Sequence, residues 1–184
     1  MKKHLTEMIF HKAFKYSPKP AFKLVSGSMS SYYFNCKSVT LHPEGMYLIG
    51  NIIFDMIKDN SIKGIGGLTL GADPIANATA YTSYLRKTPI EAFVVRKSAK
   101  SHGTMQWIEG NIKAGDSVVI VDDVITTGKS TIEAINKAIE AGLEVVKVIA
   151  LIDRQEGGRE NIEALGYKVE AVITKDEVME LYKG

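Results

Sequence analysis

Residues 118–131 read VVIVDDVITTGKST and hold three features in a row. The first four residues are apolar and β-branched, which is typical of a buried strand. Two adjacent carboxylates, Asp122 and Asp123, follow at its carboxyl end, and a small polar loop then opens a helix. In a parallel α/β sheet, ligands bind outside the carboxyl ends of the strands. The stretch therefore predicts a parallel sheet with a ligand site at this edge.

The loop from Thr126 to Thr131 suits a phosphate group. Its backbone amides and hydroxyls would lie at the positive end of a helix dipole, and Gly128 lets the backbone approach closely. The two carboxylates cannot bind phosphate, but they can accept hydrogen bonds from sugar hydroxyls or hold a hydrated Mg²⁺. A phosphorylated sugar therefore fits better than a nucleoside triphosphate. A P-loop is excluded, because that motif requires a glycine where Asp123 stands.

The rest of the chain alternates helix and strand signals, which indicates an α/β fold with a largely parallel sheet. We expect helices over 3–15, 43–58, 74–87, 129–141, 159–165 and 175–182, and strands over 65–70, 91–95, 116–121, 145–152 and 167–173. Residues 20–40 read as irregular chain with short strands, and 98–110 as a polar loop. In the helix over 129–141, the pattern predicts that Ile132, Ile135 and Ile139 face inward and that Glu133, Lys137 and Glu140 face outward.

Composition excludes several classes of protein. The chain has 184 residues, 45% of them hydrophobic, which is the size of one domain with a sizeable core. A net charge of +2 does not suggest a nucleic-acid partner. The single cysteine, Cys36, rules out an internal disulfide and favours a reducing compartment. No signal peptide or run of about 18 apolar residues is visible. We therefore expect one cytoplasmic domain over 1–184, without membrane or nucleic-acid partners.

A second motif lies at residues 94–103, which read VVRKSAKSHG. No acidic residue occurs from Arg96 to Ile108, whereas cationic groups are frequent. Such a segment suits a mobile cationic lid that neutralises a leaving pyrophosphate and excludes water. A solvated charged loop is the alternative that composition alone leaves open.

Both motifs resemble those of a known family. Residues 118–131 resemble the phosphoribosyl diphosphate (PRPP) motif of the type I phosphoribosyltransferases, with its hydrophobic strand, paired acids and Thr-Thr-Gly. Residues 96–103 are similar to Arg-Lys-x-x-Lys-x-His-Gly, the catalytic loop of the orotate-using members, at every fixed position. The ending Ser-His-Gly differs from that of the adenine- and xanthine-using relatives. Residues 66–76, 22–34 and 152–158 are similar to the family's pyrophosphate loop, amino-terminal segment and base-binding segment.

The resemblance implies a fold and a reaction. The fold would be a mostly parallel sheet flanked by helices, with residues 1–40 forming a small hood over the base. The reaction would join orotate to the phosphoribosyl group of PRPP, giving orotidine 5′-phosphate and pyrophosphate in pyrimidine synthesis. Mg²⁺ would be the cofactor, held mainly by PRPP and not by a protein cage. A homodimer would share its active sites through the loop at 96–102.

Residue roles follow by the same resemblance. Catalytic roles fall on Lys97, Lys100, His102, Asp122 and Asp123. PRPP would contact these residues together with Arg96, Val124, Ile125, Thr126, Thr127, Gly128, Lys129 and Ser130. Orotate would contact Thr126 and Arg154, because an arginine fork can bind both oxygens of a carboxylate. The alternative for Arg154 is a structural salt bridge to Asp153 or Glu156.

Three positions depart from the family pattern, and two rival functions stay open besides a bland α/β domain in which the combined motifs would be coincidence. Val25, Ser28 and Lys37 stand where relatives often carry a lysine, a basic residue and an arginine, respectively. One rival is a transferase for another nucleobase, against which His102-Gly103 and Arg154 argue. The other is a regulator that keeps the PRPP fold and binds nucleic acid, against which the low net charge argues.

Overall fold

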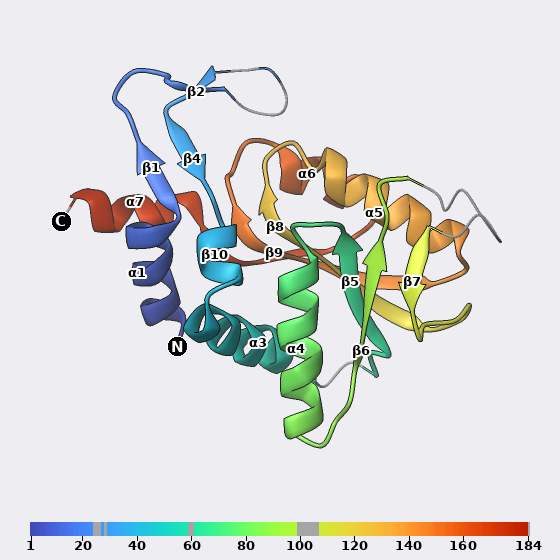
Figure 1. Cartoon of the computed structure of the whole chain (residues 1–184). Helices are drawn as coiled ribbons and strands as arrows, with labels where there is room; N and C mark the ends of the chain where they lie inside the picture. Colours follow the sequence, from blue (N-terminus) through green and yellow to red (C-terminus); the bar gives the residue numbers. More distant parts are fainter. Residues whose placement is uncertain (24–26, 28, 59–60, 99–106, 184) are drawn as a thin grey trace.

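A six-stranded sheet in the order β10-β9-β8-β5-β6-β7 forms the centre of the molecule (Figure 1). It is seen in a computed structural model that describes residues 1–23, 27, 29–58, 61–98 and 107–183. Neighbouring strands run parallel, except that β7 is antiparallel to β6. The strands are β5 (Gly64–Leu68), β6 (Glu91–Val95), β7 (Ile108–Gly110), β8 (Ser117–Ile125), β9 (Glu144–Asp153) and β10 (Val169–Thr174). The predicted α/β fold with a mostly parallel sheet is confirmed.

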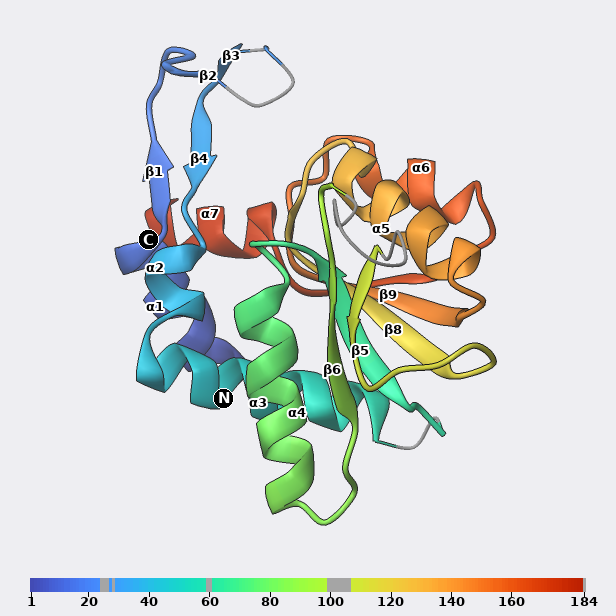
Figure 2. The ribbon, with the colours of Figure 1, turned by 45° about the vertical axis from the view of Figure 1, so that its right-hand side comes forward.

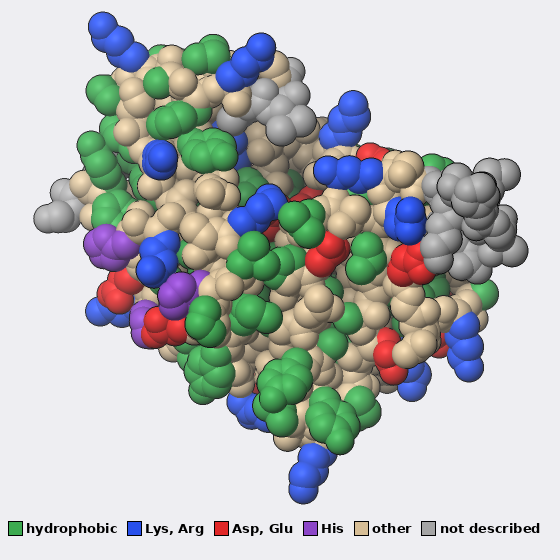
Figure 3. All heavy atoms as spheres, in the orientation of Figure 1, with side chains coloured by type: hydrophobic (Ala, Val, Ile, Leu, Met, Phe, Trp, Pro, Cys, Tyr) green, Lys and Arg blue, Asp and Glu red, His purple; other side chains and the backbone are tan. Residues whose placement is uncertain are grey.

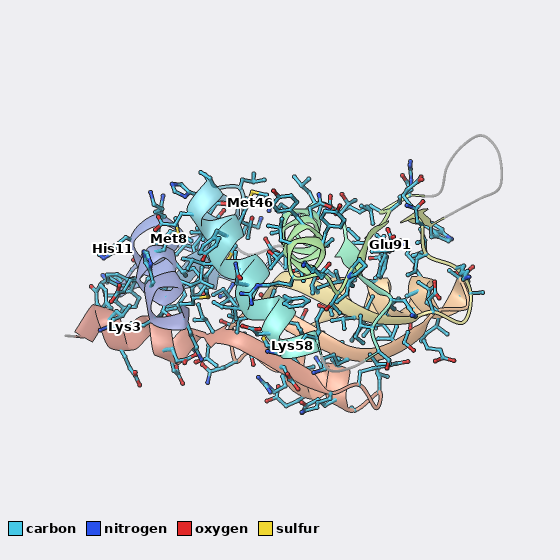
Figure 4. The ribbon with its side chains drawn as sticks, turned by 90° about the horizontal axis from the view of Figure 1, so that it is seen from below. Lys3, Met8, His11, Met46, Lys58 and Glu91 are labelled. Atoms are coloured by element: carbon cyan, nitrogen blue, oxygen red, sulfur yellow. The ribbon has the colours of Figure 1, made fainter. Side chains whose placement is uncertain are left out.

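Helices cover both faces of the sheet, so its central strands are buried on both sides. One face carries α1 (Lys2–Lys12), α3 (Pro43–Ile57), α4 (Asp73–Leu85) and α7 (Lys175–Lys183). Figure 4, a view from below, shows α3 between α1 and α4. The other face carries α5 (Lys129–Glu140) and α6 (Gly158–Glu163). Because side chains of a strand alternate between faces, Val119 and Val121 of β8 enter the first core, whereas Val118 and Ile120 enter the second.

The amino-terminal segment stands above one end of the sheet (Figure 2). Its antiparallel strands are β1 (Phe14–Tyr16) with β4 (Tyr32–Phe34), and β2 (Phe22–Lys23) with β3 (Met29–Ser30). Stacked rings support the first pair, with 5.4 Å between the ring centroids of Tyr16 and Tyr32. A short helix, α2 (Lys37–Thr40), leads back toward the sheet.

The structure differs from the sequence-based expectations in five places, one of which is α2, because residues 20–40 were expected to hold no helix. The strand expected over 116–121 continues to Ile125, because β9 keeps pairing with it there, although β5 pairs only up to Ile120. Residues 14–16 form a strand where the end of a helix was expected, and β7 lies inside the expected polar loop. In α5, Ile139 is 47% exposed, whereas Lys137 is buried. The remaining helices agree within a few residues, and Thr174 caps α7 by accepting a hydrogen bond from the amide of Glu177.

Within the described residues, no helix is long and apolar enough to cross a bilayer.

Candidate active site

Four neighbouring parallel strands end at one edge of the sheet, and each delivers a polar side chain there. In spatial order, Arg154 follows β9, Asp122 and Asp123 lie near the end of β8, Thr69 follows β5, and Arg96 follows β6. Because all four strands run the same way, residues far apart in sequence become neighbours. The edge therefore runs from one arginine, past two carboxylates, to a second arginine.

Asp122 is buried and fixes the start of α5. One of its carboxylate oxygens accepts hydrogen bonds from the hydroxyls of Ser130 at 2.9 Å and Thr131 at 2.7 Å. The other oxygen accepts a bond from the backbone amide of Asp123. Burial and the neighbouring charge of Asp123 raise the pKa of Asp122 to about 6, although these hydrogen bonds act in the opposite direction. Asp122 thus carries a costly charge, which is typical of a functional site.

Asp123 is more accessible than Asp122 and faces the opposite side of the strand. Its carboxylate lies 3.6 Å from the ammonium of Lys37 on α2. A Cβ atom on Gly71 would lie 2.5 Å from one of its oxygens, so any larger residue at position 71 would have to displace the Asp123 carboxylate. Asp123 therefore has a cation and a backbone turn beside it, with part of its side chain open to solvent.

The loop from Thr126 to Ser130 presents the amino end of α5. Gly128 precedes that helix with a φ of +80°, and no side chain caps the helix. The first amides of a helix lack partners within it, so they stay available to an anion. Asn161 donates to the carbonyl of Thr127, and a Cβ on Gly158 would lie 2.6 Å from the carbonyl oxygen of Thr126. Tight packing against α6 therefore holds the predicted phosphate loop in place.

A groove lies between the ends of β5 and β6. It is lined by Thr69, Val94, Arg96, Lys97, Ser98 and Glu109. The guanidinium of Arg96 pairs with Glu109 at 3.1 Å, whereas Lys97 is exposed. Lys100 and His102, the other basic residues of the motif, lie outside the described residues, as do Val25 and Ser28. The structure brings the first two cations of the motif next to Thr69, the residue that follows β5.

Arg154 is almost fully buried beneath the amino-terminal segment. Its Nη2 donates to the hydroxyl of Ser30 at 3.0 Å and pairs with Glu156 at 2.9 Å. The expected salt bridge with Glu156 is therefore present, whereas Asp153 pairs with Arg159 instead. The Nε of Arg154 is buried and has no hydrogen-bond partner among the described residues. An unsatisfied buried donor costs free energy, so this group is suited to a ligand acceptor.

Sequence reasoning missed one contact at this edge. Lys37 was noted only as a departure from a family pattern, yet it lies beside Asp123; no sequence signal links positions so far apart. The pairing of Arg154 with Glu156, in contrast, was one of the alternatives that the sequence left open. Cys36 is buried, and burial raises the pKa of its thiol well above the usual value, which disfavours the reactive thiolate.

Comparison with known proteins agrees with this geometry. A family model described as "Phosphoribosyl transferase domain" matches residues 37–179. The orotate phosphoribosyltransferase of Aquifex aeolicus is 44% identical over 175 residues, which covers 95% of this chain and 96% of the relative.

Two solved structures extend the similarity to three dimensions. Orotate phosphoribosyltransferase of Mycobacterium tuberculosis in complex with Fe(III) dicitrate has a TM-score of 0.82 and 36% identity, covering 96% of this chain and 98% of that one. The same enzyme in complex with PRPP has a TM-score of 0.76 and 32% identity, covering 96% and 90%. The chain therefore belongs to the phosphoribosyltransferase family and, within it, to the orotate phosphoribosyltransferases.

Proposed function

We propose that this chain transfers the 5-phosphoribosyl group of PRPP to orotate, giving orotidine 5′-phosphate and pyrophosphate, a step of pyrimidine synthesis. The observation that carries the proposal is the spatial order of Arg154, the two carboxylates, Thr69 and Arg96 along one sheet edge. That order matches the order of the reactants: an acidic base, a ribose and a pyrophosphate.

PRPP would lie across the ends of β8, β5 and β6. Its 5-phosphate meets the backbone amides and hydroxyls of Thr126 to Ser130, beyond Val124 and Ile125 of the strand. The ribose hydroxyls meet Asp123, and Asp122 holds the loop below them through Ser130 and Thr131. The pyrophosphate occupies the groove beside Thr69, which Arg96 and Lys97 also line. By the family resemblance, Lys100 and His102 of the same motif are assigned to the pyrophosphate as well.

The chemistry requires positioning more than proton transfer. As the bond from C1 to pyrophosphate breaks, positive charge develops on the ribose and negative charge on the leaving group. Carboxylates at the ribose and cations at the pyrophosphate stabilise this separation of charge. Holding both substrates on one rigid edge removes most of the entropic cost of their encounter.

Orotate would bind between β9 and the amino-terminal segment. The base carboxylate accepts from the guanidinium of Arg154, whose Nε has no acceptor among the described residues. Thr126 follows Ile125, whose carbonyl accepts a hydrogen bond from the Arg154 amide, so Thr126 and Arg154 flank the same space. Residues 1–40 act as the hood of one domain spanning 1–184.

Mg²⁺ is the proposed cofactor, and the residues present fit an ion that is carried by PRPP. No group of three metal-ligating side chains occurs in the described part of the chain. Asp123 is partly open and can bind a hydrated ion through water. The ion, when bound, offsets negative charge on the pyrophosphate; Asp123 and Arg96 orient the rest of the substrate.

A cytoplasmic homodimer with shared active sites is also proposed. Large hydrophobic side chains gather on the exposed face of α4 (Figure 3), including Tyr81, Tyr84 and Leu85. Exposed aromatic residues of this kind favour a protein interface. If Lys100 serves the neighbouring subunit, mixing Lys100→Ala and Asp123→Asn subunits will restore part of the activity. No rescue despite demonstrated subunit exchange would refute the shared site.

The reaction is tested by the loss of orotate absorbance with purified protein, PRPP and Mg²⁺. Adenine, xanthine and uracil are run alongside, and products are separated by chromatography. We expect turnover with orotate only. Turnover with another base would keep the PRPP site but overturn the assignment of the base pocket, and PRPP binding without turnover of any base would favour the regulator.

A further inference from the structure

Lys137 of α5 is buried although sequence periodicity predicts it on the outer face of the helix. Only 9% of the residue is exposed, which is rare for lysine unless its charge is paired. Its ammonium forms a salt bridge with Glu133 at 2.6 Å, one turn earlier in the helix. The remaining contacts of the ammonium lie on another part of the chain.

Those contacts join α5 to both sides of the basic motif. The Lys137 ammonium donates a hydrogen bond to the carbonyl oxygen of Arg96 at 2.9 Å, directly after β6. It also lies 4.1 Å from the ring centroid of Trp107, directly before β7. Arg96 and Trp107 are themselves joined, because the amide of Arg96 donates to the carbonyl of Trp107 at 2.8 Å. One ammonium therefore contacts both the residue that follows β6 and the residue that precedes β7.

The same helix carries the proposed phosphate loop at its amino end. Lys129 and Lys137 are separated by about 12 Å of helix axis, since each residue rises about 1.5 Å. A lysine side chain on a helix also points back toward the amino end. A rigid helix with Lys137 on its flank thus sets the distance from the loop at 126–130 to the backbone of Arg96.

We propose that Lys137 is a positioning residue that holds Arg96 and Trp107 in place relative to the phosphate loop at the start of α5. It touches no substrate and acts through the backbone of Arg96. The inference rests on the proposed function, because Arg96 meets pyrophosphate only if the chain binds PRPP as proposed. Its consequence is that Lys137 strengthens binding of the pyrophosphate end of PRPP more than binding of the 5-phosphate end.

The chain offers a matched control. Lys147 on β9 has a side chain 13% exposed, against 11% for Lys137. Its ammonium donates to the carbonyl of Met56 and pairs with Glu170, so it makes the same kinds of polar contact. Met56 belongs to α3 and Glu170 to β10, and neither lies at the candidate active site. Lys147→Met therefore removes a buried ammonium without touching Arg96 or Trp107.

The first measurement needs no activity. Trp107 is the single tryptophan, so protein emission reports on its ring. Lys137→Met should shift the emission of the substrate-free protein, and Lys147→Met should not. An unchanged spectrum in Lys137→Met would refute the contact itself. Because methionine keeps the unbranched apolar stem, the fold should survive, and the denaturation midpoints of both variants measure any general loss of stability.

The second measurement is calorimetric affinity for PRPP and for ribose 5-phosphate, which lacks the pyrophosphate. Lys137→Met should weaken PRPP binding about tenfold and leave ribose 5-phosphate within twofold, and Lys137→Arg should recover most of the loss because it keeps donors and charge. Equal weakening of both ligands, or the same effect in Lys147→Met, would overturn the proposal. These binding data stand even if the wild type fails to turn over orotate, which would refute the proposed function instead.

Discussion

Replacing Asp122 by asparagine should make the protein less active, and the stability of the variant relative to wild type should increase with pH. The pKa of Asp122 is raised from 3.8 to about 6, first by burial and then by the charge of Asp123. A folded-state pKa above the unfolded value means that the folded protein binds the proton more tightly. Stability from this group is therefore greatest below pH 3.8 and is lost as the pH rises through about 6.

The size of the effect follows from the shift. At pH 8 the ionised carboxylate costs the folded state about 3 kcal/mol, since each pKa unit is worth about 1.4 kcal/mol. At pH 5 the cost is roughly half as large, because most of the folded protein keeps the proton on Asp122 there while the unfolded chain has lost it. Asparagine has a similar shape and no charge, so the stability of the variant relative to wild type should rise by about 1 kcal/mol between pH 5 and pH 8. Any change in hydrogen bonding to Ser130 or Thr131 is the same at both values and cancels.

Urea unfolding of wild type and Asp122→Asn at pH 5 and pH 8 measures this difference directly. The control is Asp55→Asn, which removes an exposed carboxylate that pairs with Lys58 on α3. The buried charge would be refuted if the difference in the free energy of unfolding between variant and wild type stayed the same at both pH values. It would also be refuted if the variant lost stability relative to wild type from pH 5 to pH 8. Turnover should fall in the same variant, because the phosphate loop loses the carboxylate that orients it.

Two further predictions test the neighbouring groups. Gly158→Ala should weaken PRPP binding about tenfold in calorimetry, because the new Cβ would lie 2.6 Å from the carbonyl oxygen of Thr126 and displace the loop; unchanged affinity would show that the loop adapts freely. Arg154→Met should raise the KM for orotate at least tenfold and the KM for PRPP much less, because it removes the proposed carboxylate partner and leaves Glu156 unpaired. Steady-state kinetics would contradict that role if both KM values rose together.

The ligand-binding edge was predictable because its signals are local. The apolar run before Asp122 and the glycine at 128 each specify a conformation within a few residues, and their succession fixes a strand, a turn and a helix. The structure places the paired acids inside β8 and not after it, since β9 supplies hydrogen bonds up to Ile125. Pairing of that kind depends on a strand distant in sequence, so the strand's own residues could not reveal it.

The amino-terminal strands and β7 were beyond the reach of periodicity. Strands of two or three residues, such as Phe22–Lys23 and Ile108–Gly110, contain no full alternation of inward and outward side chains. Their existence depends on a partner: Glu109 of β7 pairs with Val94 of β6, and Tyr33 of β4 with Lys15 of β1. The contact between Lys37 and Asp123 likewise depends on how α2 packs, which no single segment encodes.

Lys137 and Ile139 show why an amphipathic pattern leaves the flanks of a helix undecided. The buried residues of α5 follow the 3.6-residue period of a helix; they are Thr131, Ala134, Ile135, Lys137 and Ala138. Several of them are small, so the sequence does not define the middle of the buried face sharply. A small rotation of the helix about its axis buries Lys137 instead of Ile139 at the edge of that face. The apolar preference of isoleucine favours one choice, but the carbonyl of Arg96 and the ring of Trp107 favour the other. Burying a lysine is costly unless it is paired, so the position of Lys137 is explained by its salt bridge with Glu133 together with its contacts to Arg96 and Trp107.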